Sequence, residues 1–553
     1  MNTRLLPFVF SLILGVVLFV GLLALAGVWQ AQAASQANCV AGPHSGSLAA
    51  WQDWCPEDNP HLVTDTVIVP EGVTLTLRPG VIVQAASDKW IQVTGVLHAI
   101  GTPDQPITLT SSADSGPGQW AGLYLTNGEA DLRHVTLRYA GQYNTWGYAS
   151  INVAYSTLYL EDSHVRDSAN VGNADYGVHL CCGGASATIT NTTFANIGDT
   201  TADYGVFNAS DSITVTNSTF QGITGYPMQI TAADLHRVDG NTFSGNGINR
   251  ILVLGSSGTL AVGAQMAFQT GLDAYELTGG LSVPNGKTLT IEPGVMLMAR
   301  SGGFLHILGH LAAIGTLAQP ITITSAANSG PGEWGGIYVQ EGTCDLRYLT
   351  LRYTGQTILG NQATGALMIQ SANNSAMNLD HVTLSSNALA SGPDFGLIIN
   401  GGNVTLNDSL ITGNGNTIGD YAVYLNAGEI TATHTIIQGN AGFGFYMAGG
   451  KAGLTCSTVS SNGSDGARVG SGVFSATGSG FYNNAGMGIN NLGGAKAAAA
   501  YNWWGHASGP GGMGPGSGDE VSANVVYTPW LSEETCFTGT YIYLPLVRRQ
   551  DSR

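Results

Sequence analysis

The stretch ITNTTFAN at residues 189–196 is followed by VTNSTFQG at 215–222 and VDGNTFSG at 238–245. The three segments share a phenylalanine column, and the steps between them are 26 and 23 residues. A step of this size holds three short strands and their turns, whereas a strand–helix–strand crossover needs a dozen or more residues in the connection alone. The sequence therefore predicts three-strand coils that stack into a solenoid.

This column extends in both directions along the chain. Its members are Leu137, Val165, Phe194, Phe220 and Phe243, and later Leu351, Leu384, Ile411, Ile437, Val459 and Phe481. A second column with the same period consists of triplets such as Val178-His179-Leu180, whose outer residues are apolar. Because successive strand side chains point to opposite faces, the outer residues are expected in the core and the middle one on the surface. Both columns predict an all-β fold, a right-handed parallel β-helix.

The chain also contains a long duplication. VPEGVTLTLRPGV at 69–81 matches VPNGKTLTIEPGV at 283–295, and SSADSGPGQWAGLYL at 111–125 matches SAANSGPGEWGGIYV at 325–339. Both pairs have an offset of 214 residues, so we expect two homologous halves. The predicted organisation is a signal peptide (1–34), an N-terminal cap (35–66), a first β-helix half (67–275), a second half (276–500), a closing cap (501–535) and a C-terminal tail (536–553).

The N-terminus predicts export. Arg4 precedes an apolar run from Leu5 to Val28, and Ala31-Gln32-Ala33 resembles a signal-peptidase site. The protein is therefore expected to be secreted or held at the cell surface, with a membrane contact only if this segment stays uncleaved. The chain has seven cysteines, and Cys39 and Cys55 flank a short N-terminal segment that a disulfide would staple.

Composition argues against nucleic acid as a partner. Charged residues make up 10% of the chain, and the formal net charge is −18. Such a surface repels phosphate backbones, and no cluster of Lys and Arg counteracts the repulsion.

Three segments carry a family resemblance: LTIEPGV at 289–295, PGEWGGIYV at 331–339 and NWWGHASGP at 502–510. They resemble exported bacterial right-handed β-helix proteins of the pectin-lyase-like superfamily. That superfamily includes pectate lyases, polygalacturonases, tailspikes and surface proteins without known activity, so the resemblance implies the fold strongly and the function weakly. The polygalacturonase pattern of Asn-Thr-Asp, Asp-Asp, Gly-His-Gly and Arg-Ile-Lys is missing from this sequence, and no catalytic residue can be named.

The middle residues of the triplets form the candidate ligand-binding column. The expected glycan-binding residues are Tyr124, Asn152, His179, Phe207, Tyr338, Tyr424 and Tyr446. Aromatic rings stack on the C–H faces of sugars and amides bond to hydroxyls. The alternative is that such residues simply favour strand surfaces.

Other repeated residues have structural interpretations. A row of aromatic residues three positions before the column is expected to face inward as a ladder, and it consists of Tyr176, Tyr204, Tyr226, Phe395, Tyr421 and Phe443. A row of asparagines is expected at coil corners with stacked amides, and it consists of Asn387, Asn414, Asn440, Asn462 and Asn484.

Aspartates recur one coil apart, as Asp175 with Asp203 and Asp394 with Asp420. Strand spacing would place each pair about 5 Å apart. Such a pair can bind Ca²⁺, the one cofactor that the sequence allows, or serve as a retaining glycosidase pair. The favoured interpretation is that each aspartate initiates a turn.

Three functions therefore compete. The first is a non-catalytic β-helix that binds an extracellular polysaccharide or cell-surface matrix, the second is a structural spacer, and the third is a polysaccharide lyase or glycoside hydrolase with a site built from loops.

Overall fold

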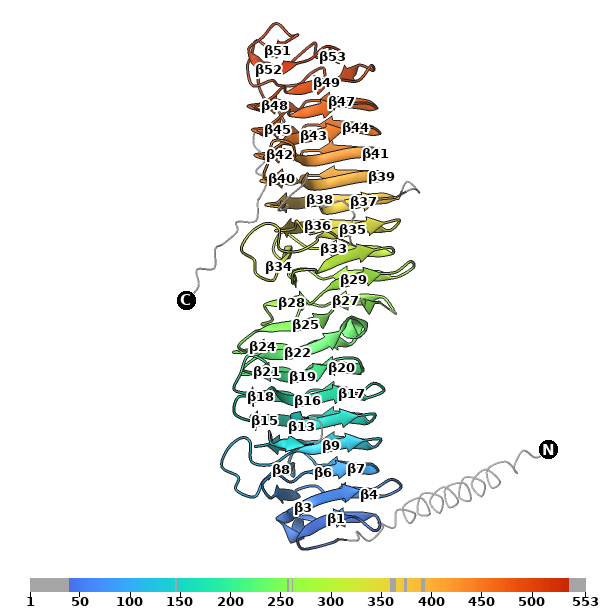
Figure 1. Cartoon of the computed structure of the whole chain (residues 1–553), viewed down its shortest axis with the longest axis vertical. Coiled ribbons are helices and arrows are strands. Elements are labelled where there is room, and N and C mark those ends of the chain that lie inside the picture. Colours follow the sequence, from blue (N-terminus) through green and yellow to red (C-terminus); the bar gives the residue numbers. More distant parts are fainter. Residues whose placement is uncertain are drawn as a thin grey trace, which may run out of the picture.

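The computed structural model describes residues 39–536, except 145–146, 256–257, 261, 359–364, 372–374 and 389–392. The predicted signal peptide and nearly all of the predicted tail lie outside the described residues. The described chain is a parallel β-solenoid of about 17 turns with two short 3₁₀ helices, so the predicted all-β parallel β-helix is confirmed (Figure 1). Within the described part, no helix is long and apolar enough to cross a membrane.

Each coil of the first half contributes one strand to each of three stacks. The stack that carries the column, here the lower stack, contains β6 (Ile91–Val93), β9 (Leu123–Thr126), β13 (Gly147–Ala154), β16 (Asp175–Cys181), β19 (Tyr204–Asn208) and β22 (Tyr226–Thr231). The second stack is an eight-stranded sheet of β2 (Gln52–Trp54), β4 (Thr74–Leu77), β7 (Val96–Ile100), β10 (Glu129–Arg133), β14 (Thr157–Glu161), β17 (Ser186–Thr190), β20 (Ser212–Thr216) and β23 (Val238–Asp239). The third contains β5 (Ile82–Ala85), β8 (Ile107–Ser111), β11 (Val135–Arg138), β15 (His164–Ser168), β18 (Thr193–Ile197), β21 (Thr219–Gln221) and β24 (Thr242–Ser244).

The second half repeats this arrangement. Its column-bearing stack, here the upper stack, contains β32 (Phe304–Ile307), β35 (Ile337–Gln340), β37 (Gly365–Gln370), β39 (Phe395–Asn407), β41 (Tyr421–Thr433), β43 (Phe443–Met447), β46 (Ala467–Val469) and β49 (Ile489–Asn491). Strands β30 (Thr288–Ile291) and β34 (Ile321–Ser325) lie 214 residues beyond β4 and β8. The duplication therefore repeats strand positions as well as sequence.

The two halves form one continuous solenoid, but its stacks shift at the junction. Strand β22 pairs with β25 (Arg250–Leu254), which pairs with β28 (Ala274–Leu277) and then β31 (Met296–Ala299) and β34. Because β34 is the counterpart of β8, the lower stack continues into the stack that corresponds to the third one of the first half. The upper stack begins separately, through β29 (Gly280–Val283). The column residues of the two halves therefore lie in two ladders, which corrects the expectation of one long face.

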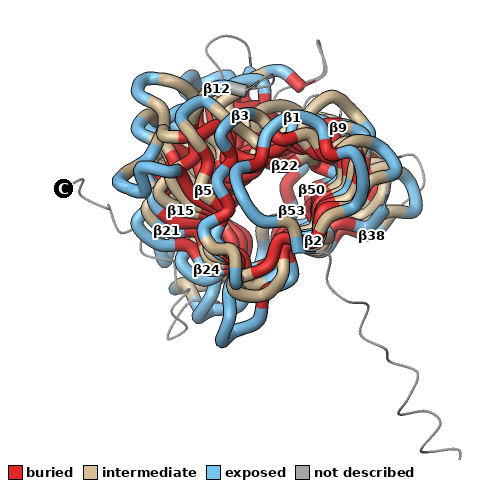
Figure 2. Tube along the Cα trace, turned by 90° about the horizontal axis from the view of Figure 1, so that it is seen from below, coloured by how far each residue is buried: buried red, intermediate tan, exposed pale blue. Residues whose placement is uncertain are grey.

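A single apolar core runs along the axis. One cluster of buried residues extends from Leu48 to Val525, and the end-on view shows buried residues lining the inside of the coils with exposed ones in the turns (Figure 2). The predicted phenylalanine column is confirmed, since Phe194, Phe220 and Phe243 are buried and stack with centroids 4.9 and 5.4 Å apart. This core holds every coil against its neighbours.

The predicted inward position of the aromatic row is wrong. A β-carbon on Gly177 would lie 2.9 Å from Phe194 Cδ1, so Gly177 faces the core, and the next residue, Val178, also belongs to the core. Two consecutive inward positions break the alternation, which places Tyr176 on the outer face beside His179, with ring centroids 4.6 Å apart. The rows still stack along the axis, with Tyr176, Tyr204 and Tyr226 6.0 and 5.7 Å apart.

The predicted asparagine row is a buried hydrogen-bonded ladder. Each Nδ2 donates to Oδ1 of the next asparagine over 2.8–3.0 Å, through Asn387, Asn414, Asn440, Asn462 and Asn484. The ladder ends at Asp519, whose Oδ2 accepts from Asn484 Nδ2 at 3.0 Å. Amide groups buried in this way are satisfied by one another, so the row stabilises the coil corners.

Two disulfides close the ends of the described chain. The predicted bridge between Cys39 and Cys55 is confirmed. A second bridge joins Cys456 to Cys536, a pair separated by 80 residues that the sequence did not single out. Beyond Tyr501, β51 (Pro510–Gly512), β52 (Gly518–Val521) and β53 (Val525–Val526) follow the last coil, where β52 pairs with β49 and β53 with β50 (Ala497–Ala498).

Candidate functional site

The predicted column points away from the core, but much of it is covered. In the upper stack Tyr338, Met368 and Ile398 are at most 2% exposed and form a second apolar cluster with Ile358, from the turn after β36 (Thr343–Arg352). The expectation that Tyr338 lies on the surface is therefore wrong, because a turn folds over this part of the face. The column opens further along, where Tyr424 and Tyr446 are half-buried.

The lower column is also mostly covered. Tyr124 is 6% exposed and Asn152 is fully buried, so neither is the surface residue that was expected. His179 and Phe207 are half-buried, and a ring nitrogen of His179 lies 2.9 Å from Asn152 Oδ1. Burial lowers the pKa of His179 to about 4, although the nearby Asp211 acts in the opposite direction. His179 is therefore neutral at pH 7 and contributes packing and a hydrogen bond.

The half-buried part of the upper column forms an aromatic surface. The rings of Tyr424 and Tyr446 lie 5.5 Å apart and 6° from parallel. The outward aromatic row of Phe395, Tyr421 and Phe443 runs beside them, and the rings of Tyr421 and Tyr446 meet edge to face at 5.0 Å. Burial raises the pKa of Tyr421 and of Tyr424, so both phenols are protonated donors at neutral pH. Here this patch of Tyr421, Tyr424, Phe443 and Tyr446 is named the aromatic patch.

A polar pocket continues the same face. In register after Tyr446 come Arg468 and then Asn490, and the guanidinium of Arg468 lies 4.3 Å from the ring centre of Phe443. Asp465 Oδ2 accepts from Arg468 Nε at 2.7 Å and from Asn490 Nδ2 at 2.9 Å. Asp465 and Asn490 also line a pocket of about 530 Å³ with Trp504, Asp519 and Glu520. The aromatic patch and this pocket, here the cap pocket, form one candidate binding surface.

The cap pocket is acidic. Asp465, Asp519 and Glu520 line it, and no basic residue is among the described residues of its lining. Asp519 accepts from the backbone amides of Asn483 and Asn484 at 2.9 and 3.1 Å, while burial raises its pKa. The sequence analysis missed this pocket, because it interpreted the Gly- and Pro-rich loop that supplies Asp519 and Glu520 only as a cap.

The aspartate rows behave as the turn interpretation requires. The amide of Asp175 donates to Asp203 Oδ1 at 2.9 Å, and the amide of Asp394 donates to Asp420 Oδ1 at 3.0 Å. Asp175, Asp199 and Asp203 also place one carboxylate oxygen each within 4.8 Å of one another. Burial is the main cause that raises the pKa of Asp175 to about 7, and the charges of Asp203 and Asp199 add to it. Proton sharing and turn capping explain this row without a metal ion.

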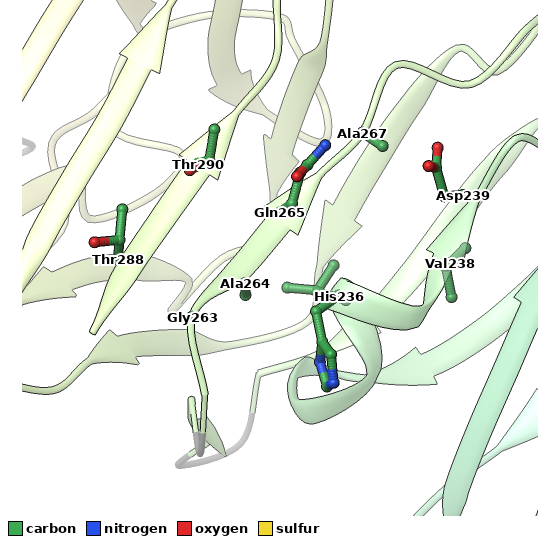
Figure 3. A pocket seen from close by; sticks show the side chains of 10 residues that line it. His236, Val238, Asp239, Gly263, Ala264, Gln265, Ala267, Thr288 and Thr290 are labelled. Atoms are coloured by element: carbon green, nitrogen blue, oxygen red, sulfur yellow. The ribbon is translucent and has the colours of Figure 1, made fainter. Parts of the chain in front are cut away.

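A smaller pocket of about 260 Å³ lies at the junction of the halves (Figure 3). It is bounded by the 3₁₀ helix η2 (Ala232–Arg237), which carries His236, and by β27 (Ala264–Met266) and β30, which present Gln265 and Thr290. The side chain of Gln265 bonds to Glu292 rather than to a group within the pocket. The lining has no aromatic platform, so we regard this pocket as a consequence of the shift between stacks.

Comparison with known proteins supports the fold. Residues 55–144 and 264–344 match the family described as a pectate-lyase like beta helix domain, one segment in each half. The chain is also similar to "Protein bark beetle" of Drosophila melanogaster, at 38% identity over 58 residues. That similarity covers 10% of this chain and 2% of the Drosophila protein. Such a short match carries no statement about activity.

Proposed function

The chain is a pectin-lyase-like β-helix repeat protein, and on that premise we propose that it binds a polysaccharide without cleaving it, through the aromatic patch and the cap pocket. The observation that carries the proposal is the parallel pair of Tyr424 and Tyr446, which continues in register into Arg468 and Asn490. Flat rings in a row suit the apolar faces of successive sugar rings, while polar groups beyond them suit hydroxyls.

The carboxylates of the cap pocket favour binding over catalysis. A glycosidase needs one carboxylic acid to protonate the leaving group and a second carboxylate to act as base or nucleophile. Asp465 is instead occupied by Arg468, Asn490 and the backbone amide of Met487, and Asp519 by Asn483 and Asn484. Groups held by so many donors within the fold act as positioning residues. Glu520 alone is exposed and has no partner among the described residues.

We place the protein outside the cytoplasm, as a secreted or cell-surface protein. Two disulfides support this location, because such bonds persist in oxidising compartments and are rare in the cytosol. A polysaccharide or a glycan-rich matrix is the partner that such a location offers.

The test is to incubate the full chain with a panel of neutral, acidic and amino polysaccharides and to record both retention and new chain ends. Retention of a polymer without new ends is the expected result. New ends would replace the binding proposal with a hydrolase or lyase, and retention of none would leave the structural spacer. The Tyr424→Ala/Tyr446→Ala variant should lose retention, while Tyr159→Ala, an exposed tyrosine on β14, should keep it.

A further inference from the structure

The charges around the aromatic patch limit which polysaccharide it can accept. Arg468 is the cation beside the patch, but its guanidinium is paired with Asp465 at 2.7 Å. Asp519 and Glu520 add two more carboxylates to the cap pocket, and the whole chain carries a net charge of −18. The surface therefore has a negative potential where the column ends.

We propose that the ligand is a polysaccharide with protonated amino groups, such as a glucosamine polymer, whose sugar rings lie on the aromatic patch and whose ammonium groups reach the cap pocket. This inference rests on the proposed function and names the substrate class of the same site.

An ammonium group has the chemistry that Glu520 lacks within the fold. Its three donors can bond to the exposed Glu520 carboxylate and to the remaining lone pairs of Asp519. Hydrogen bonds between charged groups are about twice as strong as neutral ones. A uronate would instead bring a carboxylate next to three others, and like charges in a pocket are disfavoured.

A second feature indicates that the pocket receives a sugar. Trp504 lines the cap pocket, is fully buried, and its Nε1 donor has no acceptor among the described residues. Buried donors are almost always paired, so an acceptor from outside the fold is expected. Hydroxyl oxygens of a sugar supply such acceptors, and an inorganic cation does not.

The experiment measures the affinity of the full chain, by calorimetry, for three hexamers of similar length. These are a β-1,4-linked glucosamine hexamer, its fully N-acetylated form and a galacturonate hexamer. We expect the glucosamine hexamer to bind about tenfold more tightly than the N-acetylated one, which is the effect of one charge-assisted hydrogen bond. The galacturonate hexamer should not bind, and added salt should weaken the amine preference.

Two variants separate recognition from general attraction to an acidic protein. Glu520→Gln should lower the preference for the amine about threefold, as the loss of one partly exposed charge pair does. Glu71→Gln removes an equally exposed charge in the first half and should leave the preference unchanged. Equal loss in both variants would show that only net charge matters and would overturn the inference.

The remaining outcomes distinguish the two proposals. Equal binding of the glucosamine and N-acetylated hexamers, both abolished by Tyr424→Ala/Tyr446→Ala, would keep the glycan-binding surface and overturn the amine preference. Preference for galacturonate would do the same. Binding of none of the hexamers, or binding that survives loss of both tyrosines, would overturn the proposed site itself.

Discussion

The ring of Tyr424 lies parallel to that of Tyr446 on the next coil, with 5.5 Å between the centroids and 6° between the planes. This spacing follows from the strand pairing, since Tyr424 and Tyr446 are register partners in β41 and β43. The two rings therefore act as one platform, and each supports the orientation of the other.

Removal of one ring tests the platform. We expect Tyr446→Ala to weaken binding of the retained polysaccharide about tenfold, because one stacking contact and its buried area are lost. Tyr446→Phe keeps the ring and should retain most of the affinity. Calorimetry with both variants measures the difference, and equal affinities would show that the ring is not part of the ligand contact.

The asparagine ladder makes a separate prediction about stability. Asn440 is 3% exposed, accepts from Asn414 Nδ2 at 3.0 Å and donates to Asn462 Oδ1 at 2.9 Å. Asn440→Ala leaves buried partners unpaired on both sides, so we expect a loss of about 3 kcal/mol in the free energy of unfolding. Gln221→Ala, at an exposed strand position, is the control and should change the denaturation midpoint little. Equal midpoints for the two variants would contradict a stabilising ladder.

The sequence predicted those features that the coil repeat itself determines. The phenylalanine column, the asparagine ladder and the short disulfide at the N-terminal end each depend on residues that are close in sequence or repeat with the coil. Exposure of the column could not be predicted in this way, because it depends on turns of variable length. Tyr338 and Tyr424 occupy the same column, yet only Tyr338 lies beneath Ile358.

Other misses have equally specific causes. The shift between stacks depends on where the second half begins to pair, and a sequence offset contains no information on that. Glu520 reaches the cap pocket from a loop without a period, and Cys456 pairs with a cysteine 80 residues away. The bulge at Gly177 reversed the expected face of Tyr176, although the small residue before Val178 was visible in the sequence.

Asp175 predicts how stability changes with pH. Its pKa is raised from 3.8 to about 7 by burial, so the folded state holds the proton more tightly than the unfolded state does. Stability from this group is therefore complete below pH 3.8 and is lost as the pH rises towards about 7, by on the order of 1.4 kcal/mol per pKa unit. Asp175→Asn keeps an acceptor for the amide of Asn170 and removes the charge.

We expect Asp175→Asn to unfold at a denaturant midpoint that depends less on pH than that of the parent chain, with the larger gain above pH 7. An unchanged pH dependence would contradict the raised pKa. Ca²⁺ is the control for the alternative interpretation of this row, and we expect it to leave the midpoint unchanged. A rise with Ca²⁺ that Asp199→Asn removes would show that Asp175, Asp199 and Asp203 form a cation site.

The disulfide between Cys456 and Cys536 ties the end of the described chain back to the body of the solenoid. It encloses 80 residues, which include the last coils, the loop of the cap pocket and Glu520. Closing a loop of this length restricts the unfolded chain, so Cys456→Ala/Cys536→Ala should lower the stability of this end by about 2–4 kcal/mol. Limited proteolysis should then cut first beyond Asn490. The same variant should also bind the polysaccharide less tightly, because the wall of the cap pocket opens more often. The matched variant Cys39→Ala/Cys55→Ala, at the opposite end, should leave that affinity unchanged, and a loss of affinity in both would contradict a local role for the bridge.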